Sequence, residues 1–181
     1  MGGYRVDQIA AHLAARGDGV ELRFNPFWEV SSSISSVWAA RDLLTGGYAI
    51  MNGDTVYEAD LVAESFARVR PGLNLFVEPV VTPALDDMLV ELEGDLVRAV
   101  AKTLDPARAR FHSLGVIVGY DDGGAYGAAL DAVIRSATGI QSFHHAIIDD
   151  LARKGPVHGL VIDAGHWVEI DRVEDIAGWK G

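Results

Sequence analysis

The chain has 181 residues, which is enough for one domain with a hydrophobic core and too few for two ordinary domains. Apolar residues make up 49% and charged residues 23%, and the net charge is −11; this balance excludes a disordered chain and disfavours nucleic acid as a partner. The absence of cysteine excludes disulfide bonds, thiolate metal sites and thiol catalysis. An acidic pocket can still bind a nucleotide, because a bound metal ion supplies the positive charge.

We expect neither a membrane-spanning helix nor a signal peptide in this sequence. Its apolar runs end well short of the ~18 residues that a membrane-spanning helix needs. Residues 1–10 lack the hydrophobic segment of a signal peptide. We therefore expect a cytoplasmic protein that does not bind a membrane.

The first third of the chain alternates between helical and strand patterns. Residues 6–16 place their apolar side chains on one face, and Gly17 is a natural helix stop. The predicted elements are a helix at 6–16, a strand at 20–25, a helix capped by serines 31–33 and running through 38–44, a buried parallel strand at 48–51 and a helix at 59–70. This alternation is typical of parallel βαβ units.

The rest of the chain predicts further strands, including a hairpin that turns at Gly94-Asp95. The predicted elements are strands at 73–81, 88–93, 96–101 and 111–120, helices at 124–136 and 143–154, a strand at 157–163 and a helix at 173–179. Together they predict a single α/β domain over residues 1–181, a three-layer α/β/α sandwich with a mixed, mostly parallel sheet. In such sheets ligands bind beyond the carboxyl ends of the strands.

Carboxylates follow two of the predicted strands. Asp54 comes after the strand at 48–51, and Gly53 beside it permits a sharp turn and the close approach of a ligand. In the last segment, alternation places Glu169 and Asp171 on one side. Carboxylates at strand ends can share Mg²⁺ with a triphosphate, as in phosphoryl and nucleotidyl transfer. Alternatively, Asp54 stabilises a turn and Asp171 caps the last helix.

Cationic and hydroxyl side chains supply further candidates. Lys102 ends a predicted strand and is either a contact for a phosphate or a solvated strand end. Serines 31–36 present hydroxyls to a base, a ribose or an anion, or cap a helix. His144 and His145 are adjacent, lack the spacing of a zinc site and are expected on different sides of their helix.

The order of five segments resembles the nucleotidyltransferase family. The segments are NPFWEVSSSISSVWAAR, IMNGDTVYE, VAKTL, LGVIVG and WVEIDRVEDI. The pattern is most similar to the small cytidylyltransferases that act on phosphocholine or inositol 1-phosphate, which share the nucleotide-diphospho-sugar transferase fold with sugar-1-phosphate nucleotidylyltransferases. The resemblance implies Mg²⁺-dependent transfer of NMP, with CMP favoured, from an NTP to a phosphorylated small alcohol or sugar 1-phosphate, with release of pyrophosphate.

The same resemblance assigns roles to residues. Asp54 and Asp171 match the positions that hold Mg²⁺, and Lys102 matches the lysine that contacts the acceptor's phosphate. The expected substrate-binding residues are Asn25, Ser32, Ser33, Ser36, Gly53 and Glu169. The implied partners are an NTP and a small phosphorylated acceptor, without nucleic acid or membrane, and a homo-oligomer is compatible with the sequence.

The sequence departs from the family pattern at its start. Family members begin with a strand, a glycine-rich phosphate loop that carries an arginine, and a helix. This sequence starts at Gly2-Gly3-Tyr4, which matches the end of the family's second strand, so the resemblance implies an N-terminally truncated domain. Two hypotheses follow: an active nucleotidyltransferase whose remaining part comes from a longer product or in trans, or a catalytically inactive remnant that serves as a binding or partner module.

Overall fold

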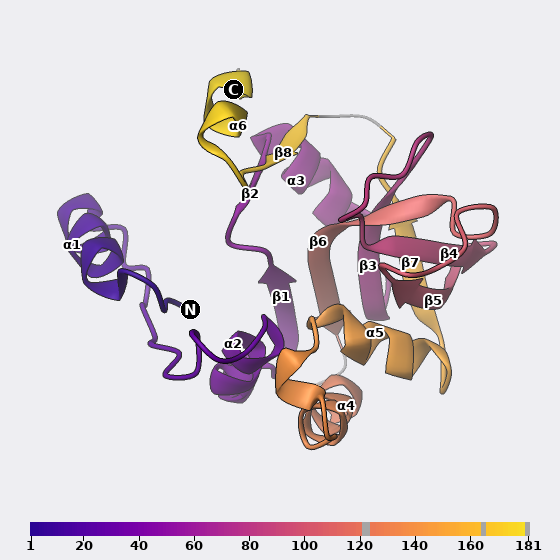
Figure 1. Ribbon diagram of the computed structural model, residues 1–181, viewed down its shortest axis with the longest axis horizontal. Coiled ribbons are helices and arrows are strands. Elements are labelled where there is room, and N and C mark those ends of the chain that lie inside the picture. The colour runs from indigo at the N-terminus through magenta and orange to yellow at the C-terminus, as the bar shows by residue number, and fades with distance from the viewer. Residues whose placement is uncertain (121–123, 164–165, 180–181) are drawn as a thin grey trace.

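A six-stranded mixed sheet forms the centre of the molecule (Figure 1). The structure is a computed structural model that describes residues 1–120, 124–163 and 166–179. The strands of the sheet are β1 (Gly47–Met51), β6 (Phe111–Tyr120), β3 (Gly72–Pro79), β7 (Val157–Val161), β5 (Leu96–Ala101) and β4 (Leu89–Glu93), in that spatial order. The short strands β2 (Thr55–Tyr57) and β8 (Trp167–Glu169) pair with each other in a separate two-stranded sheet.

Helices cover both faces of the large sheet. The helices are α1 (Val6–Arg16), α2 (Ile34–Ala39), α3 (Ala59–Ala67), α4 (Gly124–Ile134), α5 (His145–Ala152) and α6 (Val173–Gly178), with 3₁₀ turns η1 (Arg41–Leu43) and η2 (Gly139–Gln141). Helices α2, α4 and α5 lie on one face and α3 on the other (Figure 1). In the described part of the chain, no helix is long and apolar enough to cross a membrane.

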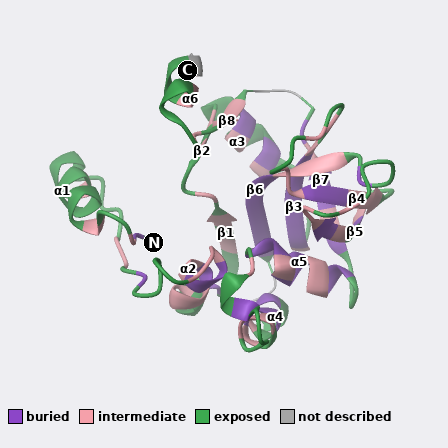
Figure 2. Ribbon diagram, in the orientation of Figure 1, coloured by how far each residue is buried: buried purple, intermediate pink, exposed green. Residues whose placement is uncertain are grey.

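Side-chain alternation in the central strands builds the two cores. In β3, Leu75 and Val77 pack into the cluster that α4 and α5 cover, whereas Phe76 points into the cluster beneath α3. In β6, Ile117 joins the first cluster and Val116 the second. Figure 2 shows the buried residues concentrated in these strands. The three-layer α/β/α sandwich predicted from the sequence is therefore confirmed.

The sheet is mixed, as predicted, but the expectation that it is mostly parallel is wrong. Among the strand pairs that the structure describes, only β3 and β7 are parallel. The ten-residue strand β6 returns through the middle of the sheet and pairs antiparallel with β1, β3 and β4. The expected buried parallel strand at 48–51 is accordingly the antiparallel strand β1 at the sheet edge, where Tyr48 and Ile50 pack on the core and Ala49 and Met51 are exposed.

The N-terminal segment differs most from expectation. Residues 20–25 form no regular strand, and their one strand-like contact is a bridge between Gly2 and Phe24. The helix expected through 38–44 ends earlier, at Ala39, and continues as η1. Helix α1 forms where predicted but buries none of its residues, so it adds nothing to either core (Figure 2).

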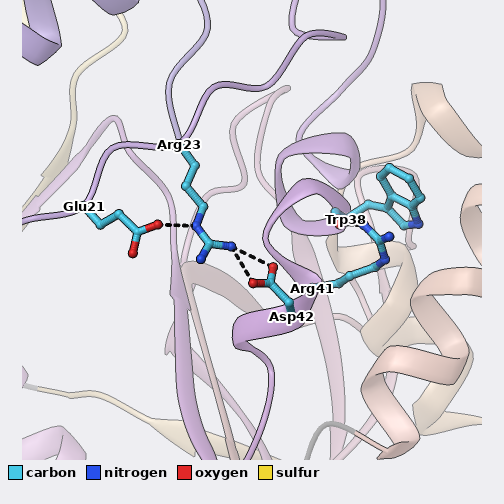
Figure 3. Close-up of polar contacts among 5 residues, drawn as sticks. All are labelled: Glu21, Arg23, Trp38, Arg41 and Asp42. Atoms are coloured by element: carbon cyan, nitrogen blue, oxygen red, sulfur yellow. Dashed lines mark hydrogen bonds and ion pairs between the residues drawn. The ribbon is translucent and has the colours of Figure 1, made fainter.

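Arg23 links this N-terminal segment to the rest of the domain (Figure 3). Arg23 donates from Nη1 to both carboxylate oxygens of Asp42, each at 2.7 Å, and from Nε to Glu21 at 2.6 Å. These bonds lower the pKa of Asp42 and raise that of Arg23. Beside them, the Arg41 guanidinium lies 3.8 Å from the Trp38 ring centroid. The Arg23–Asp42 ion pair links the segment before α2 to η1, which follows α2.

A glycine breaks the regularity of β6. Gly115 has φ +73°, and the β3–β6 register shifts at this point. Its carbonyl accepts the Asn52 N–H at 3.0 Å, and a Cβ at position 115 would lie 2.6 Å from the Asn52 side chain. Its N–H donates to the Ser113 hydroxyl at 3.0 Å. Gly115 therefore fixes the end of β1 just before Asp54.

We predict that Gly115→Ala destabilises the protein. A left-handed conformation costs an L-residue about 1–2 kcal/mol, and the contact with Asn52 adds to this cost. Gly127→Ala is a matched control, because a Cβ at position 127 in α4 meets nothing within 4 Å and should add ~0.5–1 kcal/mol of stability. Urea denaturation measures both changes. Equal stability of the two variants would contradict the prediction.

Candidate active site

A cleft of about 540 Å³ opens where β1 ends. Its walls come from β1 and the turn after it, α2, the loop before β4, the first residues of β6, the start of α5, and β8. Its polar lining residues are Ser33, Ser36, Asn52, Asp54, Asp86, Asp87, Lys102, His112, Ser113, His144, His145 and Glu169. Residues far apart in the sequence therefore share one site.

Three carboxylates meet beside this cleft, and two of them, Asp54 and Glu169, line it. The antiparallel pairing of β2 with β8 places Thr55 opposite Glu169, and the Ile170 N–H donates to the Asp54 carbonyl at 2.7 Å. One oxygen from each of Asp54, Glu169 and Asp171 lies within 4.8 Å of the others. Burial, and then the charges of the two aspartates, raise the pKa of Glu169. Such a set of hard oxygen ligands fits Mg²⁺, whose charge would offset this repulsion.

Contacts of the Trp167 and His112 side chains link β8 to the large sheet. The Trp167 Nε1–H donates to Glu78 Oε2 at 3.0 Å, and Glu78 Oε1 lies 2.7 Å from His112 Nε2. The His112 ring also meets the Trp167 ring edge-on, with centroids 5.6 Å apart. Because Glu78 lies on β3 and His112 on β6, this network fixes the position of Glu169 relative to the cleft.

Lys102 lies in the same cleft as the carboxylates. Its Nζ is 3.4 Å from Asp86 Oδ1 and 4.7 Å from the centroid of the Phe143 ring. Its charge lowers the pKa of Glu169, against the larger effects of burial and the aspartates. Of the residues that the sequence analysis singled out, Asp54 and Lys102 line the cleft, whereas Asp171 lies near Asp54 but outside the cleft lining.

Asn25 forms hydrogen bonds with two of the serines in the segment 31–36. It is buried, and its Nδ2 donates to the hydroxyls of Ser35 at 3.0 Å and Ser36 at 3.1 Å. Its Oδ1 accepts the Phe27 N–H at 2.9 Å. Ser36 lines the cleft, as expected of a substrate-binding residue, whereas Asn25 lies outside the lining.

Of the other expected substrate-binding residues, some line the cleft and others do not. Ser33 and Gly53 line the cleft, and Ser32 does not; its N–H donates to the Ile140 carbonyl. A Cβ at Gly53 would meet nothing within 4 Å, so this glycine leaves open space. Ser33 is the N-cap residue of α2, as the sequence analysis expected, but its hydroxyl contacts His144 and makes no capping hydrogen bond to the helix.

His144 and His145 line the same cleft, although the sequence analysis expected them on different sides of a helix. His144 is the N-cap of α5 rather than a residue within it, and the two ring centroids lie 4.3 Å apart. Burial lowers the pKa of His144 to about 4, with a smaller opposing effect of Asp54. Burial, His144 and Lys102 together lower the pKa of His145 well below its usual value. Both rings are therefore neutral at physiological pH.

Comparison with known proteins identifies the fold. The sequence matches no protein-family model and no curated protein. In three dimensions it resembles the inositol-1-phosphate CTP transferase from T. maritima, with TM-score 0.75 and 14% identity, covering 96% of this chain and 69% of that chain. It also resembles the CTP:phosphocholine cytidylyltransferase from Streptococcus pneumoniae, with TM-score 0.72 and 14% identity, covering 95% and 72%.

The chain therefore has the nucleotide-diphospho-sugar transferase-like α/β fold, and its structural neighbours are nucleotidyltransferases. The family resemblance read from the five sequence segments is confirmed at the level of the fold.

We predict that His144 makes folding stability depend on pH. Its pKa is about 4 in the folded state and 6.5 ordinarily, so the unfolded chain binds more protons between these values and stability falls as the pH drops through this interval. The full shift corresponds to about 3 kcal/mol. His144→Gln should make this dependence shallower without removing it, because burial also lowers the pKa of His145, whereas His12→Gln on the exposed helix α1 should not change it. Urea denaturation across the interval measures the slopes, and equal slopes for His144→Gln and wild type would contradict the prediction.

Proposed function

We propose that the cleft is the active site of a Mg²⁺-dependent nucleotidyltransferase. The reaction transfers NMP, with CMP favoured, from an NTP to a phosphorylated small alcohol or a sugar 1-phosphate and releases pyrophosphate. The observation that carries this proposal is the meeting of Asp54, Glu169 and Asp171 beside a cleft that Asp54, Glu169 and Lys102 line. The names of two of the structural neighbours, both CTP-using transferases, support the same reaction class.

Each charged group has a role in this reaction. Asp54 and Asp171 would hold Mg²⁺, with Glu169 beside them, and the bound ion would supply charge neutralisation for the triphosphate. Lys102 would hold the acceptor's phosphate as a compact positive charge. An oxygen of that phosphate attacks the α-phosphorus of the NTP, and the bond to the leaving pyrophosphate breaks. The protein forms no covalent bond, so the chemistry requires no cysteine.

The size and charge of the cleft agree with small substrates. Its volume of about 540 Å³ falls in the range of small-molecule sites. The net charge of −11 disfavours a polynucleotide, whereas an NTP bound with a metal ion carries its own compensating charge. We therefore propose an NTP and a small phosphomonoester as the partners.

An assay for pyrophosphate tests the proposal. The protein is incubated with Mg²⁺, each common NTP in turn, and phosphocholine, inositol 1-phosphate or a sugar 1-phosphate. The proposal predicts pyrophosphate release that requires both the metal and one acceptor. Nucleotide binding without pyrophosphate from any pair would instead support the alternative, a catalytically inactive binding module of the same fold.

We predict that Asp54→Asn and Asp171→Asn each abolish tight binding of Mn²⁺, a spectroscopic substitute for Mg²⁺, because each removes one carboxylate ligand. Without metal, both variants should be at least as stable as wild type, since each relieves repulsion within the cluster. Asp60→Asn, an exposed change on α3, is the matched control. Electron paramagnetic resonance titration measures free Mn²⁺. Unchanged binding in either cluster variant would contradict the metal assignment.

We predict that Lys102→Ala raises KM for the acceptor by tenfold or more and leaves KM for the NTP nearly unchanged. The lost charge–phosphate contact is worth roughly 1.5–3 kcal/mol. Lys154→Ala is the control, because Lys154 lies past the end of α5 and pairs with Asp150. Steady-state kinetics with each substrate varied in turn separates the two constants, and an unchanged acceptor KM would contradict the role.

A further inference from the structure

Two serine–histidine pairs stand side by side in the cleft wall. The Ser33 hydroxyl oxygen accepts the backbone N–H of His144 at 3.1 Å and lies 3.1 Å from Nδ1 of the same residue. The Ser113 hydroxyl oxygen accepts the Gly115 N–H at 3.0 Å and lies 2.9 Å from His145 Nε2. Each hydroxyl thus receives a backbone proton and retains its own proton to donate.

This arrangement favours one tautomer of each ring. Each hydroxyl oxygen already accepts a backbone N–H, which leaves the hydroxyl proton to be donated to the imidazole nitrogen beside it, from Ser33 to His144 Nδ1 and from Ser113 to His145 Nε2. A neutral imidazole has one N–H, which must then lie on Nε2 of His144 and on Nδ1 of His145. These two nitrogens are the ones that are buried without a hydrogen-bond partner among the residues described. Unpaired buried donors are costly, so each calls for an acceptor.

The neighbours of the two rings identify the kind of acceptor. The rings are 97% and 95% buried and line the cleft at the start of α5. Lys102 shares this wall, above the ring of Phe143, and its charge acts on His145. Its ion-pair partner among the described residues, Asp86, is largely exposed to solvent. Two N–H donors and an ammonium group in one wall make a site for an oxyanion.

We propose that His144 Nε2–H and His145 Nδ1–H donate hydrogen bonds to the phosphate of the acceptor, which Lys102 holds by its charge. This inference rests on the proposed function and extends it to two binding residues. Because both donors are uncharged, they orient the phosphate without neutralising it, so the attacking oxygen retains its negative charge. A neutral donor pair beside a single lysine therefore suits a phosphomonoester that must act as a nucleophile.

Nuclear magnetic resonance of the imidazole nitrogens tests the proposal. The full chain is labelled with ¹⁵N-histidine and titrated with glycerol 3-phosphate in the presence of a metal chelator. The proposal predicts that the ring signals of His144 and His145 shift on titration, while those of His12 and His158, which lie outside the cleft lining, stay fixed. Signals that move only with CTP and Mg²⁺, or with neither ligand, would overturn it.

Substitutions supply a second measurement. His144→Phe and His145→Phe should each weaken glycerol 3-phosphate binding at least tenfold, the loss expected for one hydrogen bond to a charged group. His144→Gln should recover part of this loss, because its amide can donate from near the position of Nε2. Melting curves establish that each variant is folded. If Lys102→Ala abolishes binding and the histidine variants do not change it, this inference fails and the proposed function stands.

Discussion

Three consecutive residues of β6, from Ser113 to Gly115, contact the elements that position the cleft. The Ser113 hydroxyl contacts His145 at the start of α5, the Leu114 carbonyl accepts a hydrogen bond from Tyr57 on β2, and the Gly115 carbonyl accepts the Asn52 N–H at the end of β1. All three contacts depend on the turn of the backbone at position 115, which a side chain would obstruct. The carboxylate end and the imidazole end of the cleft are therefore positioned by one irregularity in one strand.

The two ends of the cleft differ in charge as well as in origin. At one end, Asp54, Glu169 and Asp171 concentrate negative charge, and burial together with the two aspartates raises the pKa of Glu169. At the other end, Lys102 lies beside imidazoles that burial keeps neutral. Under the proposed function, a metal-bound triphosphate would occupy the first end and a phosphomonoester the second. Catalysis on this account consists of positioning and charge neutralisation, so a cleft without a protein nucleophile is sufficient.

The sequence predicts local structure better than it predicts long-range pairing. The hairpin at Gly94-Asp95 and the helix at 6–16 form as expected, because turn residues and apolar periodicity determine them locally. The short apolar run at 48–51 gives no signal for its partner, and it pairs at the sheet edge rather than inside it. The meeting of Asp54 with Asp171 depends on β2 and β8, three residues each. The position of these carboxylates after predicted strands suggests that they share a metal ion, and the family resemblance assigns both of them to that role.

Thermal unfolding with CTP, UTP, GTP, ATP and dTTP, each with and without Mg²⁺, tests the central claim most directly. A nucleotide at ~100 times its dissociation constant stabilises the folded state by about 2.7 kcal/mol, which raises the melting temperature by several degrees in a domain of this size. We predict a shift with CTP that requires Mg²⁺ and disappears in Asp54→Asn. A shift that is equal without Mg²⁺ or in the variant, or no shift with any nucleotide, would contradict the claim that this cleft binds a metal–nucleotide complex.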